Sequence, residues 1–280
     1  MISRPTALCI AILTATSIVC VAPVTGAEVH QTTLDNGIHL LIVQDELTDI
    51  TGAHLALDVS AADVPDSKTG VRSVCQQLLI DYLNEQVNEN GSRTGLGDTL
   101  RSGGDFRLSA ETEFVQGQFA VPSGDTEHAL GALAELFFED ISVTSQYLAS
   151  ARETVLKDIE NSLNEVSFRT YQLFLDALYG KNPLNPDMAT RLNAIGRLSV
   201  TDIMSCRNTL YTPERAYLTV VSPHPASTVE SMVTGAFGEC QAGPGKDTKV
   251  MPGLPAESNV EVAEADDIRY ASMFVGVPLP

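Results

Sequence analysis

The residues of this chain that could carry out chemistry are few and scattered. The histidines are His30, His39, His54, His128 and His224, and no two of them lie within four residues of each other. The sequence therefore contains neither H-E-x-x-H nor H-x-x-E-H, the helical motifs that place two histidines on one zinc ion. Asp81, Asp158 and Glu160 have side chains that bind cations, but helical carboxylates usually form a solvated face.

Two further candidates lack the partner residue that their chemistry needs. Ser73 has no neighbouring His or Lys that would activate its hydroxyl as a nucleophile. Ser102-Gly103-Gly104 is too short for a phosphate-binding loop, and no lysine follows it. The residues by themselves indicate no catalytic centre and no cofactor motif.

A helix from Gly70 to about Asn88 holds Ser73 and is the best-defined element of the sequence. Its apolar residues recur at steps of three and four, which is the period of a helix with one buried face. Those residues are Val71, Val74, Cys75, Leu78, Leu79, Tyr82 and Leu83. The Asn90-Gly91 pair is expected to end the helix.

The other predicted elements are strands and helices without strict alternation. The predicted strands follow an Asn36-Gly37 hairpin turn and run over Ile38 to Val43, Gly52 to Ser60, Glu113 to Val121, Arg215 to Val221, Val260 to Ala263 and Arg269 to Val277. The predicted helices are Thr94 to Arg101, Thr126 to Phe138, Thr144 to Tyr179 with a break near Asn164, Ser199 to Leu210 and Ala226 to Phe237. This order predicts an α+β fold with a largely antiparallel sheet and helices packed on it.

Four segments of the sequence resemble the pitrilysin/insulinase family of zinc metallopeptidases, the inverzincins. Thr33-Leu34-Asp35-Asn36-Gly37 is similar to its opening T-L-x-N-G hairpin, and Lys68-Thr69-Gly70-Val71 to the K-T-G-L before its motif helix. Residues 103–110 and 152–159 are similar to its G-G-x-x-N-A-x-T strand and to the helix that supplies its distal zinc ligand. The resemblance covers about Val29 to Phe237 and implies the fold of the family's first domain.

The resemblance also implies where a zinc site would be, and those positions have changed. The two histidine positions of H-x-x-E-H fall on Ser73 and Gln77, and the general-base position falls on Gln76. The distal glutamate falls on Asp158, and the substrate-strand asparagine falls on Arg107. Hydroxyl and amide groups are poor zinc ligands, and an amide cannot accept a proton at neutral pH. We therefore predict no catalytic residue and no bound zinc or other cofactor.

The chain divides into four predicted parts. Residues 1–27 have one charge, Arg4, a long apolar run and a small-residue end, which indicates a secretory signal peptide. Residues 28–240 form the metallopeptidase-like domain, 241–258 a linker rich in Gly and Pro, and 259–280 the start of a truncated second domain. We expect export to the periplasm or the medium, and no stable membrane span after the signal is removed.

Composition narrows the class of partner. Hydrophobic residues make up 44% of the chain, enough for a core, and the net charge of −19 disfavours nucleic acid and anionic membranes. A basic partner or peptide would be attracted. Cys75 lies on the apolar helix face and is expected in the core, while a disulfide between Cys206 and Cys240 stays open.

The sequence and its resemblance to the family leave three functions open. The favoured one is a catalytically inactive, exported homologue that acts as a non-catalytic subunit or peptide-binding partner of an active family member. An exported scaffold or binding protein without a peptidase partner is the alternative. An active zinc metalloendopeptidase is less favoured, because three chemical positions on one helix have changed together.

Overall fold

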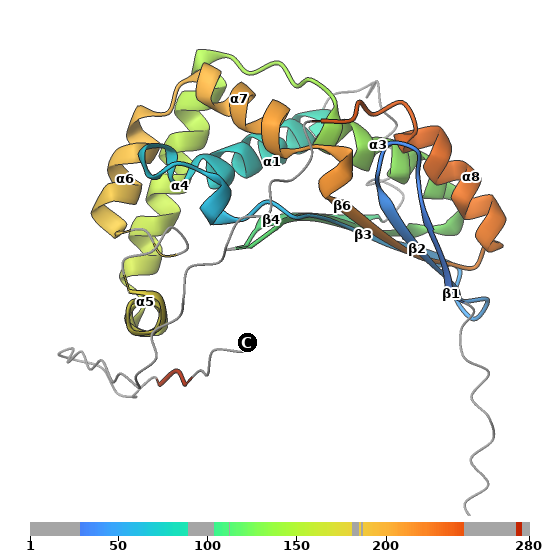
Figure 1. Ribbon diagram of the computed structural model, residues 1–280, viewed down its shortest axis with the longest axis horizontal. Coiled ribbons are helices and arrows are strands. Elements are labelled where there is room, and N and C mark those ends of the chain that lie inside the picture. The colour runs from blue at the N-terminus through green and yellow to red at the C-terminus, as the bar shows by residue number, and fades with distance from the viewer. Residues whose placement is uncertain are drawn as a thin grey trace, which may run out of the picture.

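The computed structural model describes residues 29–88, 104–111, 113–180, 185, 187–243 and 273–275. Within these ranges the chain forms one six-stranded sheet with helices packed on it (Figure 1). The predicted signal peptide, the short helix from Thr94 to Arg101, most of the predicted linker and the strand from Val260 to Ala263 lie outside the described residues.

The sheet is mixed, with one parallel pair. Its strands are β1 (Val29–Thr33), β2 (His39–Gln44), β3 (Ile50–Leu57), β4 (Asp105–Ala110), β5 (Val115–Pro122) and β6 (Ala216–Ser222). Their order across the sheet is β1-β2-β6-β3-β5-β4. Strands β2 and β6 run parallel and the other neighbours are antiparallel, so the predicted largely antiparallel sheet is confirmed.

Local sequence explains the turns and the faces of these strands. Gly37 adopts a φ of 97°, the left-handed conformation that its hairpin turn requires. Leu55 and Leu57 of β3 are fully buried, while His54 between its buried neighbours reaches the opposite face and pairs with Gln116 at 2.7 Å. The period of two thus gives the sheet an apolar face and a more polar one.

The helices differ from the sequence prediction in one important place. They are α1 (Val71–Asn88), α3 (Thr126–Phe138), α4 (Ser145–Leu163), α5 (Val166–Tyr179), α6 (Met188–Arg197), α7 (Val200–Leu210) and α8 (Ala226–Phe237). Short 3-10 turns occupy Ala61–Asp63, Asp66–Lys68, Ser123–Asp125 and Pro213–Arg215. The predicted break near Asn164 is confirmed between α4 and α5. Helix α6 was not predicted, and the described part of the predicted last strand, Met273 to Val275, is not a strand.

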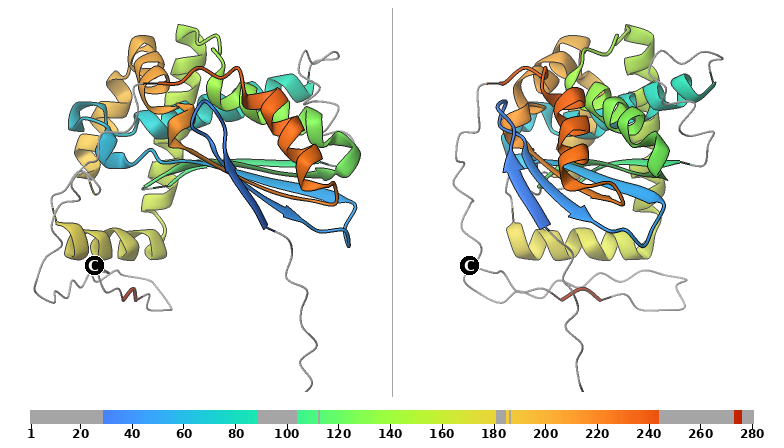
Figure 2. Two further views of the ribbon diagram at one scale, coloured as in Figure 1. Left: turned by 45° about the vertical axis from the view of Figure 1, so that its right-hand side comes forward. Right: turned by 90° about the vertical axis from the view of Figure 1, so that its right-hand side faces the viewer.

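The helices form a layer on the apolar face of the sheet. Helices α1, α3 and α8 lie over the strands in Figure 1, and α5 lies apart, below the other helices, in both views of Figure 2. The largest fully buried side chains come from both layers and include Leu40, Ile42, Leu79, Leu133, Phe137 and Phe237. None of the described helices is long and apolar enough to cross a membrane.

A small network of hydroxyl groups lies inside this core. Thr51 of β3 and Ser222 of β6 share a hydrogen bond of 2.8 Å, and Thr51 shares another of 2.8 Å with Thr126, whose hydroxyl also lies 2.7 Å from the carbonyl oxygen of Ser123. Thr51, Thr126 and Ser222 are all nearly or fully buried. Their hydroxyl groups satisfy one another, as buried polar groups generally must.

The start of α1 is held by close contacts with other elements. Gly70 has a φ of 88°, and a Cβ atom there would lie 2.4 Å from Ile195 of α6, so glycine is required both by conformation and by space. The buried guanidinium of Arg72 donates to the carbonyl groups of Glu111 and Phe114, in the turn between β4 and β5. These contacts fix the first turns of α1 against α6 and the sheet.

Candidate functional site

A pocket of about 290 Å³ opens beside the first turns of α1. Its lining comes from α1, α4, α5, α6 and the end of β4. The lining residues are Ser73, Gln76, Gln77, Ile80, Ala110, Val155, Asp158, Ile159, Ser162, Phe168 and Arg191. The structure thus brings Ser73, Gln76 and Gln77 together with Asp158, which the family resemblance had put at one site.

Arg107, the fifth position taken from the resemblance, is not part of this lining. It lies on β4, and its guanidinium is exposed and pairs with Asp105 at 2.8 Å. Ala110, three residues further along the same strand, is the residue of β4 that lines the pocket. Arg107 is therefore engaged in an exposed ion pair outside the pocket.

Helices α4 and α6 form one wall of the pocket because a side chain joins them. The guanidinium of Arg152 on α4 donates to the carbonyl groups of Gly196 and Leu198, at 3.1 and 3.0 Å. A cation at a helix end satisfies carbonyl groups that have no partner within the helix. This contact holds α6 beside α4 and so places Arg191 against α1.

Arg191 supplies the pocket with a fixed positive charge. Its guanidinium donates to the hydroxyl of Ser73 at 3.3 Å, across 118 residues of sequence. Burial lowers the pKa of Arg191 from its ordinary value of 12.5, although the side chain stays charged at neutral pH. Among the described residues no carboxylate forms an ion pair with it.

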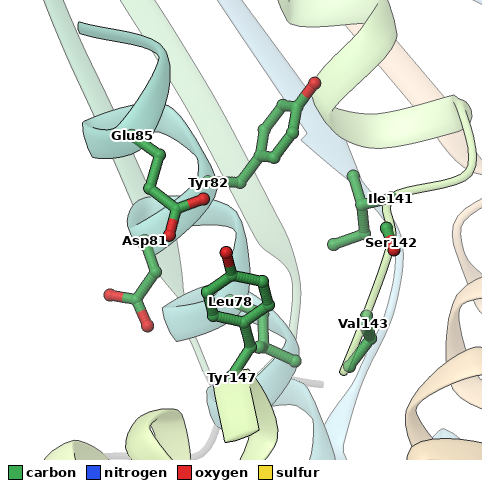
Figure 3. A pocket seen from close by; sticks show the side chains of 8 residues that line it. All are labelled: Leu78, Asp81, Tyr82, Glu85, Ile141, Ser142, Val143 and Tyr147. Carbon is green, nitrogen blue, oxygen red and sulfur yellow. The ribbon is translucent and has the colours of Figure 1, made fainter. Parts of the chain in front are cut away.

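The amide of Gln77 is engaged within its own helix. It donates to the Asp81 carboxylate at 2.8 Å, one turn further along α1. Asp81 also lines a second pocket on α1, which holds only about 20 Å³ and has room for about one water molecule (Figure 3). In that pocket Asp81 and Glu85 lie on the helix, and the segment from Ile141 to Val143 forms the opposite side (Figure 3).

Gln76 is the unusual residue of the larger pocket. The residue is only 5% exposed, and neither its amide nitrogen nor its amide oxygen has a hydrogen-bond partner among the described residues. A buried polar group without a partner costs about 1–3 kcal/mol. Such an arrangement marks a donor and an acceptor that are available to a ligand.

The residues of this pocket do not fit a zinc ion. Zn²⁺ is held by imidazole, thiolate or carboxylate groups, and the pocket offers one carboxylate, that of the exposed Asp158. Arg191 would place a positive charge beside the metal at Ser73. No group of three or more His, Cys, Asp or Glu side chains suited to a metal occurs anywhere in the described part of the chain.

The structure does not contain the disulfide between Cys206 and Cys240 that the sequence left open. The three described cysteines, Cys75, Cys206 and Cys240, are free. Cys75 is fully buried, as predicted, and a hydrogen bond between its thiol and that of Cys206 raises the pKa of Cys75. Burial raises the pKa of Cys240 to about 11. The thiol beside Cys206 therefore belongs to Cys75.

Arg191 is the residue of the pocket that sequence reasoning missed. It lies on α6, which was not predicted, although the sequence carried two signals for it. Asp187 is followed by Thr190, whose backbone N–H the Asp187 side chain accepts, and the apolar residues Met188, Leu192 and Ile195 follow at helical spacing. The contact with Ser73 had no signal in the sequence.

Comparisons with known proteins identify relatives of this fold. No protein-family model matches the sequence. The chain is 24% identical over 243 residues to the insulin-degrading enzyme of Drosophila melanogaster, covering 81% of this chain and only 23% of that enzyme's length.

Solved structures of similar fold come from the same group of peptidases. Pitrilysin superposes with a TM-score of 0.69 at 16% identity, over 83% of this chain and 25% of that one. The peptidase M16 inactive domain from Pseudomonas fluorescens superposes with a TM-score of 0.66 at 16% identity, over 81% of this chain and 54% of that one. The chain therefore has the fold of a peptidase M16 domain and resembles the first domain of the pitrilysin/insulinase family, with a degenerate H-x-x-E-H motif.

Proposed function

We propose that this protein is an exported, catalytically inactive homologue of the family that binds a peptide or a partner chain without cleaving it. One observation carries the proposal. The pocket at the family's site positions holds the Arg191 guanidinium at Ser73 and the unpartnered amide of Gln76, in place of metal ligands and a base. These groups form hydrogen bonds, and none of them activates water.

The position of the sheet edge supports peptide binding. Strand β4 has one strand neighbour, β5, among the described residues, and the end of β4 reaches the pocket through Ala110. An edge strand offers backbone N–H and C=O groups to an added strand. An extended segment alongside β4 would therefore lead toward Gln76.

The working form that we propose is a non-catalytic subunit of an active family member, with no zinc of its own. The net charge of −19 favours a basic partner surface or a basic peptide segment. An exported scaffold without a peptidase partner is the second form, and a partner experiment separates the two.

The first test measures metal content and hydrolysis. The full chain, purified without chelators, is expected to contain well under one zinc per molecule and to leave a mixture of quenched fluorescent peptides intact, with or without added Zn²⁺. One tightly held zinc per chain, or hydrolysis that a chelator abolishes, would contradict the proposal.

The second test concerns the partner. Affinity purification of the tagged chain from its native cells is expected to recover a homologue that carries an intact H-x-x-E-H motif. A monomer in size-exclusion chromatography that recovers no such chain would exclude the subunit form and leave the scaffold form.

A further inference from the structure

We propose that the pocket on α1 recognises a peptide through a carboxylate, which Arg191 binds, and through a neighbouring peptide group, which Gln76 binds. The inference rests on the proposed peptide-binding function and names the chemistry that this site would select. It concerns Arg191 and Gln76, neither of which could act on a peptide bond as a nucleophile or base.

The positive charge of Arg191 is the feature that would bind a carboxylate. A guanidinium is planar and presents five N–H donors, and its natural counterpart is a carboxylate held by two parallel hydrogen bonds. The hydroxyl of Ser73, at 3.3 Å, is the one described group that accepts from this guanidinium, and a single neutral acceptor leaves most of the donors available. Burial removes water from Arg191, as the lowered pKa reflects, so a bound carboxylate would replace lost solvation.

The charges around the pocket attract an anion on the side of Arg191 and repel it on the side of Asp158. Arg72 is close enough to Arg191 that the two charges interact unfavourably. Asp158 lies on the exposed side of the same pocket without an ion pair among the described residues. A ligand carboxylate is thus attracted by the arginine side of the pocket and repelled by Asp158 on the other.

The amide of Gln76 is the group that would bind the peptide backbone of the ligand. A side-chain amide carries a donor and an acceptor on adjacent atoms, and so does a peptide group, so the two can pair through two hydrogen bonds. Both amide atoms of Gln76 are buried and have no hydrogen-bond partner among the described residues, and Gln76 is one of the residues that line the pocket. A ligand peptide group there would remove the penalty of burying an amide without a partner.

The carboxylate could come from an acidic side chain or from a peptide C-terminus, and the acidity of the whole chain restricts the remainder of the peptide. A net charge of −19 repels a strongly acidic peptide at distances up to a Debye length of about 8 Å. The class of ligand is therefore a peptide with one carboxylate at the pocket and neutral or basic residues around it.

The test uses pools of fluorescent hexapeptides, acetylated and amidated at their ends, with one position fixed in turn as Glu, Gln or Lys. The full purified chain is titrated with each pool, and fluorescence anisotropy gives the affinity. We expect a Glu pool to bind about tenfold or more tightly than its Gln counterpart, because hydrogen bonds to a charged carboxylate are stronger than those to a neutral amide. Pools with a free C-terminus show whether a terminal carboxylate serves equally well.

Variants assign the preference to residues. Arg191→Gln is expected to abolish the Glu-over-Gln preference, Arg191→Lys to keep part of it, and Asp158→Asn to strengthen it. Arg197→Gln, an exposed arginine of the same helix, is the matched control and should change nothing. Gln76→Leu should weaken Glu and Gln pools by the same factor. Thermal melting checks that each variant folds. If Arg191→Gln does not fold, the single variants Arg191→Lys and Asp158→Asn carry the test.

The outcomes separate this inference from the proposed function. Equal, measurable binding of Glu and Gln pools, or a preference that persists in Arg191→Gln, would overturn carboxylate recognition and leave peptide binding intact. Absence of binding by every pool, with either kind of C-terminus, would overturn the peptide-binding function and this inference with it.

Discussion

Two buried polar sites of this protein lie in one domain and have opposite hydrogen-bonding status. In the core, the hydroxyl groups of Thr51, Thr126 and Ser222 satisfy one another at 2.8 Å. In the pocket, the amide of Gln76 is as well buried but has no partner among the described residues. The first arrangement stabilises the fold, whereas the second carries a cost that a bound ligand would offset. The difference separates a structural polar site from one available for binding.

The largest expected effect is on zinc affinity. It tests whether the charge of Arg191, as well as the replacement of the ligand side chains, prevents the pocket from binding zinc. The triple variant Ser73→His, Gln76→Glu, Gln77→His recreates an H-x-x-E-H sequence with Asp158 as the distal ligand. Adding Arg191→Leu should raise zinc affinity about a hundredfold or more, because the guanidinium that reaches Ser73 would otherwise lie beside a doubly charged metal, and charges this close repel by several kcal/mol even in partly screened surroundings. Competition with a fluorescent zinc chelator measures both affinities.

The control for this series is Arg197→Leu in the triple variant, which removes an exposed charge of α6 and should leave zinc affinity unchanged. Equal affinities with and without Arg191 would show that its guanidinium is not near the site in solution.

The next effect breaks the core side of the comparison. Thr51→Val keeps the shape of the side chain but removes the hydroxyl that Ser222 and Thr126 share, so we expect a loss of about 1–2 kcal/mol in the free energy of unfolding. Urea unfolding followed by circular dichroism measures it. Thr219→Val on the more polar face of β6 is the matched control, expected within about 0.5 kcal/mol of the parent. A Thr51→Val protein as stable as the control would remove the network from the list of stabilising features.

The pocket side of the comparison predicts a change of the opposite sign. Gln76→Leu removes a buried amide without a partner and keeps a similar volume, so it should raise the free energy of unfolding by about 1 kcal/mol. The same urea titration measures it. A clear loss of stability would mean that Gln76 has a hydrogen-bond partner in the folded protein. A gain would show that the buried amide costs stability, which is the cost expected of a site kept for binding.

The smallest effect sharpens the comparison at the surface. Asp202 caps α7 through Ser199 and pairs with Lys68 at 2.7 Å, and the Lys68 contact, then the Ser199 hydrogen bonds, lower its pKa from 3.8 to about 2. A lowered carboxyl pKa stabilises the fold above pH 4 and loses this effect as the pH falls from 4 to 2. Asp202→Asn should therefore cost about 0.5–1 kcal/mol at pH 7 and nothing near pH 2. Thermal melting at both pH values measures it, and an effect independent of pH would assign the loss to the cap geometry alone.

The sequence by itself determined the elements that have a strong local period. The helix bearing Ser73 and the alternation of β3 follow from spacing alone, because one buried face must be apolar. Asn36-Gly37 specified its turn, since few residue pairs accept a positive φ. The replacement of the family's ligand positions was also legible in the sequence, because it depends on residue identity and not on packing.

Only the tertiary structure decided what surrounds those positions. Arg191 reaches Ser73 because Gly70 leaves room for Ile195 and because Arg152 holds the end of α6 beside α4. Each of these contacts joins residues far apart in sequence. The local sequence around one residue does not predict which distant residue it contacts. The missing partner of Gln76 is a property of the packed pocket as well. A residue type sets what a side chain can do, whereas packing decides which groups it meets and which of its hydrogen bonds stay open.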